Sequence, residues 1–91
     1  MSYRIILTEN AEEGLEKLEK NDPEAYKKVN ELIGELMDHP KVGEGKPEEL
    51  RNIMDGEWSR RISEKHRLVY NVSDKQMAVK ILSTYGHYND K

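Results

Sequence analysis

The chain has no cysteine and no phenylalanine, and only three of its 91 residues are proline. Without cysteine it can form neither a disulfide framework nor a thiolate metal site, which suits a reducing cytoplasm. Its N-terminal apolar run, Ile5-Ile6-Leu7, is too short for a secretory signal or a membrane span. We therefore expect a cytoplasmic protein that does not bind or span a membrane.

Apolar residues are also scarce. Hydrophobic residues make up 35% of the chain and the mean hydropathy is -0.96. A length of 91 residues predicts one small domain, residues 1–91, and the low hydrophobic content predicts that its core is thin. A partner that covers part of its surface would add to its stability.

The charge is distributed unevenly along the chain. The formal net charge is -3, but residues 1–45 carry six Lys/Arg against eleven Asp/Glu, and residues 46–91 carry nine against seven. Four cationic side chains lie within eight positions, namely Arg60, Arg61, Lys65 and Arg67. A local positive surface is therefore expected on an acidic protein, with the acidic first half turned away from any nucleic acid.

The first half predicts a strand and two helices. Tyr3-Arg4-Ile5-Ile6-Leu7 is typical of a strand, and Thr8 can cap a helix in which Ala11, Leu15 and Leu18 form an apolar stripe. Asp22-Pro23 is typical of the start of a second helix, which should end near His39-Pro40. So short a connection predicts an antiparallel helical hairpin that covers a sheet.

The second half predicts a three-stranded antiparallel meander. After a loop at residues 43–48, residues 48–54 fit either a helical turn or extended chain. Strands are expected at 57–62, 66–70 and 77 to about 85. Alternation places Trp58, Arg60 and Ile62 on one face of the first of these strands. The expected architecture is α+β, with one twisted, mainly antiparallel sheet that carries two helices on one face.

Four blocks in this half resemble the successive signatures of one family. They are Gly45-Lys46-Pro47-Glu48, Trp58-Ser59-Arg60-Arg61-Ile62, His66-Arg67-Leu68-Val69-Tyr70 and His87-Tyr88. In this order and spacing they resemble the Txe/YoeB family of bacterial toxins, within the RelE superfamily. The resemblance covers nearly the whole chain and implies a RelE-like fold.

The resemblance implies an mRNA interferase, a toxin that cleaves messenger RNA in the A site of the 70S ribosome. It implies that a YefM-type antitoxin holds the toxin inactive, and it leaves open whether the free toxin is a monomer or a homodimer. The residue roles that it implies are general base for Glu48, phosphate stabiliser for Arg67, general acid for His87, substrate placement for Tyr88, and RNA binding for Lys46, Arg60 and Arg61.

These residue types suit RNA cleavage without a metal or another cofactor. A carboxylate can take the 2'-hydroxyl proton, an imidazole can protonate the departing 5'-oxygen, and a guanidinium can meet charge on the phosphorane. Arginine also offers two parallel donors to phosphate oxygens. The three histidines have no short metal-type spacing, so a zinc site is not expected.

Other interpretations of the same residues stay open. The arginines could be exposed charges that guard sheet edges. His39 and His66 are interpreted as surface residues, and Trp58 and Tyr70 as core. The competing functions are a ParE-like toxin that binds a protein such as gyrase, and an inert α+β interaction module. Neither would need a carboxylate, an arginine and a histidine together.

Overall fold

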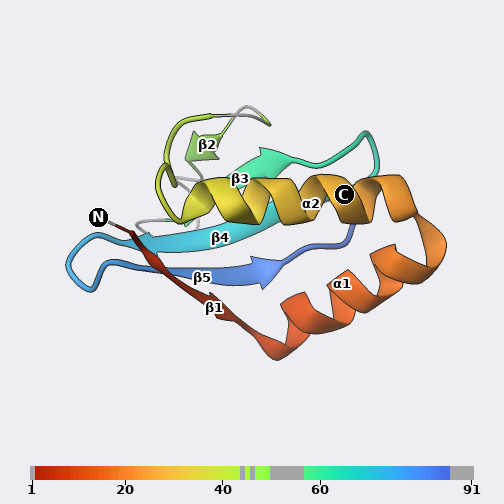
Figure 1. Cartoon of the computed structure of the whole chain (residues 1–91), viewed down its shortest axis with the longest axis horizontal. Coiled ribbons are helices and arrows are strands. Elements are labelled where there is room, and N and C mark those ends of the chain that lie inside the picture. Colours follow the sequence, from red (N-terminus) through yellow and green to blue (C-terminus); the bar gives the residue numbers. More distant parts are fainter. Residues whose placement is uncertain (1, 44, 46, 50–56, 87–91) are drawn as a thin grey trace.

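The computed structural model describes residues 2–43, 45, 47–49 and 57–86 (Figure 1). Two helices and five strands follow one another along these residues. They are β1 (Arg4–Leu7), α1 (Glu9–Asn21), α2 (Pro23–Leu36), β2 (Glu48–Glu49), β3 (Glu57–Arg61), β4 (Arg67–Ser73) and β5 (Ala78–Ser83). The predicted α+β class is confirmed.

All five strands belong to one sheet, in the order β1-β5-β4-β3-β2. β1 runs parallel to β5, and the other neighbours are antiparallel. The predicted meander is β3-β4-β5. The sheet has one strand more than predicted, because Glu48 and Glu49 are extended and pair with Ser59 and Trp58. This settles the start of the segment that was left open; its residues 50–54 lie outside the described part.

Both helices begin where their caps predict. The Thr8 hydroxyl accepts a hydrogen bond from the Ala11 N–H at 3.1 Å. The Asp22 carboxylate accepts one from the Ala25 N–H at 3.3 Å, with Pro23 in the first turn of α2. Each cap satisfies a backbone donor that a helix start leaves unpaired. α2 ends at Leu36, a few residues before the predicted end.

The core lies between the helices and one face of the sheet, which α2 crosses in Figure 1. The helices contribute Ala11, Leu18, Ala25, Val29, Leu32 and Leu36, and the second half contributes Ile62, Leu68, Tyr70, Val72, Val79 and Ile81. Trp58 and Ile62 face the core, as the predicted alternation requires. Tyr70 is fully buried and Trp58 packs against the core partly buried, as expected. The other face of β3 and β4 carries the candidate site.

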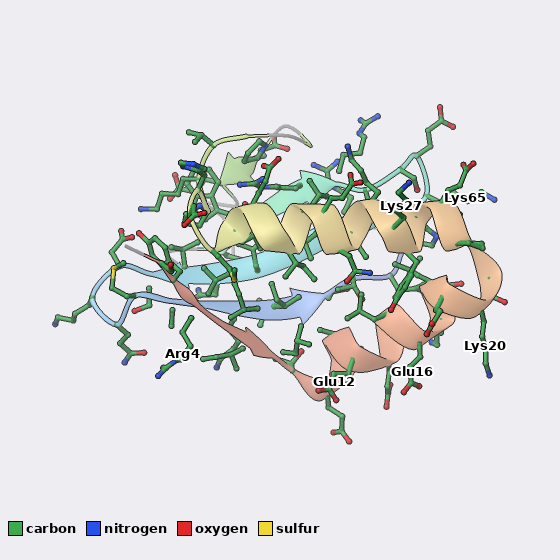
Figure 2. All side chains as sticks on the ribbon, viewed as in Figure 1. Arg4, Glu12, Glu16, Lys20, Lys27 and Lys65 are labelled. Carbon is green, nitrogen blue, oxygen red and sulfur yellow. The ribbon has the colours of Figure 1, made fainter. Side chains whose placement is uncertain are left out.

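The outer surface of α1 is acidic. Glu12 and Glu16 project from α1 away from the sheet (Figure 2). This arrangement keeps their charge off the sheet face that carries the candidate site. Among the described residues, no helix combines the length and the apolar character needed to cross a membrane.

Asp74, in the turn between β4 and β5, joins three distant parts of the chain. Its carboxylate accepts hydrogen bonds of 2.7 Å from the Lys41 ammonium and of 2.7 Å from the Tyr3 hydroxyl. These two bonds, that from Lys41 first, lower the pKa of the Asp74 carboxyl. The N-terminus and the chain after α2 are thereby tied to the same turn.

Candidate active site

Two glycines shape the loop that leads to Glu48. Gly43 and Gly45 have φ of +126° and +82°, which glycine adopts without the steric cost of a side chain. A Cβ on Gly45 would also lie 2.9 Å from the carbonyl oxygen of Arg61. The Gly45 carbonyl accepts a hydrogen bond of 2.7 Å from the Arg61 N–H. The loop is thus fixed to the end of β3, close to where β2 begins its pairing.

Arg60 anchors the chain after α2 from inside the protein. Its guanidinium donates to Glu35 Oε1 at 2.7 Å, to the Val42 carbonyl at 2.8 Å, to the Tyr70 hydroxyl at 3.1 Å and to the His39 carbonyl. The Tyr70 hydroxyl in turn donates to the Pro40 carbonyl at 2.7 Å, and burial raises the pKa of this hydroxyl.

The prediction that Arg60 contacts RNA is wrong, because its side chain has no exposed surface. Alternation along β3 turns Arg60 to the core face with Trp58 and Ile62. The guanidinium is tolerated there because a carboxylate, a hydroxyl and backbone carbonyls satisfy it. Its role is to hold the chain that precedes the glycine loop.

Glu48 and Arg67 meet on the other face of the sheet. Arg67 Nη2 lies 3.5 Å from Glu48 Oε1, a long ion pair, and 3.3 Å from the Ser59 hydroxyl. Strand pairing explains the meeting, because Ser59 on β3 lies opposite Glu48 on β2. The Glu48 side chain is 69% exposed and that of Arg67 is 19% exposed. A ligand from solvent can therefore reach the carboxylate, beside a guanidinium that the sheet holds in place.

Arg61 adds a second cation to this face. It pairs directly with Arg67 across β3 and β4, so both side chains leave the sheet on the same side. Arg61 is exposed, as its predicted role in RNA binding requires. Like charges opposite each other are unfavourable in a free sheet, and an anion bound between them would relieve that repulsion.

The chain just before His87 comes back to the same place. The Arg67 N–H donates to the Gly86 carbonyl at 2.9 Å. Gly86 is therefore fixed beside the strand residue whose side chain meets Glu48. His87, Tyr88 and Lys46 lie outside the described residues, so their predicted roles stay predictions.

Two residues of this region were not recognised as functional from the sequence. No sequence motif marks Ser59 as functional, although the alternation along β3 places it on the face opposite Trp58. His66 was interpreted as a surface residue, which is wrong because only 7% of it is exposed. Its Nδ1 accepts a hydrogen bond from the Gly86 N–H at 2.8 Å.

A further carboxyl, Glu57, lies on the same face as Ser59, two residues earlier on β3. It is 4% exposed, and burial raises its pKa. Its Oε1 has no hydrogen-bond partner within the part of the chain that is described. Across the same residues, no three His, Asp or Glu side chains are grouped closely enough to hold a metal ion.

Comparison with known proteins identifies the family. The family model for the YoeB-like toxin of the bacterial type II toxin-antitoxin system matches residues 7–88. Toxin YoeB of Escherichia coli strain K12 is 40% identical over 76 residues, which cover 84% of this chain and 90% of that protein.

Solved structures agree with this result. The YoeB dimer of Staphylococcus aureus is 37% identical with a TM-score of 0.81, and the match covers 97% of this chain and 100% of that one. YoeB in the heterotetrameric YoeB-YefM complex from Staphylococcus aureus is 37% identical with a TM-score of 0.78, at the same coverage. The chain therefore belongs to the YoeB-like toxins of bacterial type II toxin-antitoxin systems.

Proposed function

We propose that this toxin is a ribosome-dependent endoribonuclease that cleaves mRNA in the A site by acid-base catalysis. The observation that supports the proposal most is the exposed Glu48 carboxylate 3.5 Å from the partly buried Arg67 guanidinium. A base next to a fixed cation is what attack by a ribose 2'-hydroxyl on its own phosphate requires. A toxin that acted only by binding a protein would have no use for this pair.

In the proposed reaction, Glu48 takes the proton of the 2'-hydroxyl, and the 2'-oxygen forms a bond to phosphorus. The bond from phosphorus to the 5'-oxygen breaks, and His87 gives its proton to that oxygen. The products are a 2',3'-cyclic phosphate and a 5'-hydroxyl. Arg67 stabilises the charge that builds on the phosphorane oxygens between these two proton transfers.

The resting contacts of Arg67 fit this role. Its long ion pair with the exposed Glu48 can be exchanged for a shorter contact to phosphate, and Ser59 keeps the guanidinium in place during the exchange. Arg61 and Lys46 would contact flanking phosphates, and Tyr88 would help to place the substrate. Arginine is suited to both cationic positions because its donors match phosphate geometry.

The proposed partners are mRNA on the 70S ribosome and a YefM-type antitoxin. The antitoxin is supported by the similar Staphylococcus aureus protein, which is found in a complex with YefM. A homodimer is proposed for the free toxin, since a YoeB of the same species forms a dimer. The proposed location is the cytoplasm, where translating ribosomes are found.

Glu48→Gln is expected to lower the rate of cleavage by about 10²- to 10⁴-fold, the usual contribution of a positioned proton-transfer group. The rate should be measured on ribosomes programmed with a defined message, with naked RNA as a parallel substrate. Glu49→Gln is the matched control, because Glu49 is the other residue of β2 and pairs with Trp58, not Ser59. It should cleave at close to the native rate.

Equal loss of activity in both glutamine variants would contradict the assignment of Glu48 as the base. A native protein that leaves ribosome-bound message intact would contradict the endoribonuclease itself. In that case the ParE-like and inert-module alternatives would be preferred, and arrest of DNA gyrase would separate them.

A further inference from the structure

His66 occupies a buried position at the start of β4, among residues 85–86, the start of α2 and the hairpin that joins β3 to β4. Its backbone carbonyl accepts hydrogen bonds from the Ile62 N–H at 3.0 Å and the Ser63 N–H at 3.1 Å, which closes that hairpin. Its imidazole ring lies 4.6 Å from the ring of Tyr85, centroid to centroid, with a tilt of 39°. The backbone of His66 is therefore fixed by the hairpin, and its ring packs against Tyr85.

Gly86 is bound at both of its backbone groups. Its N–H donates to His66 Nδ1 at 2.8 Å, and its carbonyl accepts from the Arg67 N–H at 2.9 Å. His66 and Arg67 are neighbours at the start of β4, and they hold Gly86 on both sides of its Cα. The His66 side chain holds the Tyr85–Gly86 peptide, and the Arg67 backbone holds the Gly86 carbonyl. The φ of Gly86 is +80°, in the left-handed region that glycine adopts without steric cost.

We propose that His66 is a positioning residue for the general acid, because it holds Gly86, the residue that precedes His87. This inference rests on the proposed function of His87. Glycine offers little stiffness of its own, so the direction of the chain after Gly86 depends on how the groups on both sides of its Cα are held. An error of about 1 Å in the placement of a catalytic group can lower a rate by about 10²-fold.

The hydrogen bond also specifies the protonation state of His66. Nδ1 accepts from an N–H, so it carries no proton, and the ring proton of the neutral form is on Nε2. Nε2 lies 3.8 Å from Asp22 Oδ2 at the start of α2, which suits a proton there. The cationic form would set two N–H groups against each other at Gly86.

The charged and titratable groups around the ring come from each neighbouring element. Asp22 faces it from the start of α2, and Arg67 follows it on β4. Tyr85 stacks on it, and from α1 the Lys17 ammonium lies 5.3 Å from the centroid of the Tyr85 ring. The hydrogen bond from Gly86 requires an unprotonated Nδ1 on His66, whereas His87 has to carry a proton in the proposed reaction.

The test compares three variants that differ in what stands at the position of Nδ1. His66→Leu keeps a side chain of similar bulk but has no acceptor. His66→Asn places an acceptor near Nδ1 that does not titrate, and His66→Gln carries the same amide further out, near Nε2. We expect single-turnover cleavage on programmed ribosomes to fall about 10- to 100-fold in His66→Leu and His66→Gln, with little change in KM, and His66→Asn to recover much of the rate.

The second readout does not depend on activity. Hydrogen exchange of the Gly86 amide, followed by NMR, should be slow in the native protein and in His66→Asn, and fast in His66→Leu. The ¹⁵N shifts of the His66 ring should show a proton on Nε2 only. Melting temperatures of all variants identify any that lose the fold. If His66→Leu is unfolded, the comparison of His66→Asn with His66→Gln still tests the proposal.

Three outcomes would contradict different parts of this proposal. Fast exchange at Gly86 in the native protein would overturn the proposed hold on this peptide. Loss of protection in His66→Leu with an unchanged cleavage rate would overturn the positioning role. A native protein that cleaves nothing would overturn the proposed function and the role of His66 in it, while the exchange data would still decide whether His66 holds Gly86.

Discussion

Arg67→Ala is expected to lower the rate of mRNA cleavage on the ribosome by about 10²- to 10³-fold, the usual cost of removing one donor from a site that stabilises developing negative charge. The reason lies in the geometry of the resting site. The Arg67 guanidinium donates to Ser59 and lies beside Glu48. Its planar set of N–H donors can contact these residues and a phosphate together, which the single ammonium group of lysine cannot do in the same geometry. Single-turnover rates at saturating toxin are the measurement.

Arg67→Lys and Arg4→Ala complete this experiment. Arg67→Lys keeps the charge but loses the paired donors, so its rate should fall between those of the native protein and Arg67→Ala. Arg4 is an exposed arginine of β1, at the opposite edge of the sheet from β2, and Arg4→Ala should cleave at the native rate (Figure 2). A native rate in Arg67→Ala, with the fold intact, would exclude Arg67 from the chemistry.

Arg60→Leu is expected to lower the free energy of unfolding by about 3 kcal/mol, the upper end for ordinary single substitutions, because it breaks the hydrogen-bond network around a fully buried guanidinium. The substitution removes the hydrogen bonds that Arg60 donates to Glu35, to the Val42 carbonyl and to the Tyr70 hydroxyl. A small domain has only about 5–15 kcal/mol of stability in total, so the melting temperature should fall by more than about 10 °C. Thermal and urea unfolding followed by circular dichroism measure the change.

Arg61→Ala is the matched control for this substitution. Arg61 is the next residue of β3 and is exposed on the other face, so its loss should change stability by less than about 0.5 kcal/mol. RNA binding at low temperature, where both variants are folded, should give the opposite result. Arg61→Ala should bind RNA more weakly than the native protein, and Arg60→Leu should bind it as well as the native protein does. If Arg60→Leu unfolded like the native protein and bound RNA poorly, the interior position of Arg60 would be contradicted.

Local patterns predicted most of the fold. Thr8 and Asp22 are caps because their side chains reach backbone donors within one turn, an interaction that adjacent residues determine. Alternation placed Trp58 and Ile62 on the face that packs against the core. β2 was not predicted, because Glu48-Glu49 has neither apolar residues nor β-branching. Its pairing depends on β3 and on the bond from Arg61 to the Gly45 carbonyl.

The site shows where local patterns stop. Alternation had already placed Arg60 beside Trp58 and Ile62, yet a buried arginine is expected only if its partners are known. These partners lie 18 to 25 positions earlier, apart from Tyr70 on the neighbouring strand. His66 was misplaced for the same reason, since its partner Gly86 is 20 positions away. The contact between Glu48 and Arg67 was not predicted, because no spacing within one strand could show it; the family resemblance only implied that both residues act in one reaction.

The chemistry of the cut ends tests the central claim most directly. Message cleaved on programmed ribosomes by the native protein should carry a 2',3'-cyclic phosphate on the upstream fragment and a 5'-hydroxyl on the downstream one. These ends follow only if a base activates the 2'-hydroxyl, as proposed for Glu48, and an acid protonates the 5'-oxygen, as proposed for His87. A 3'-hydroxyl with a 5'-phosphate would mean that water is the nucleophile, and would contradict the proposed mechanism.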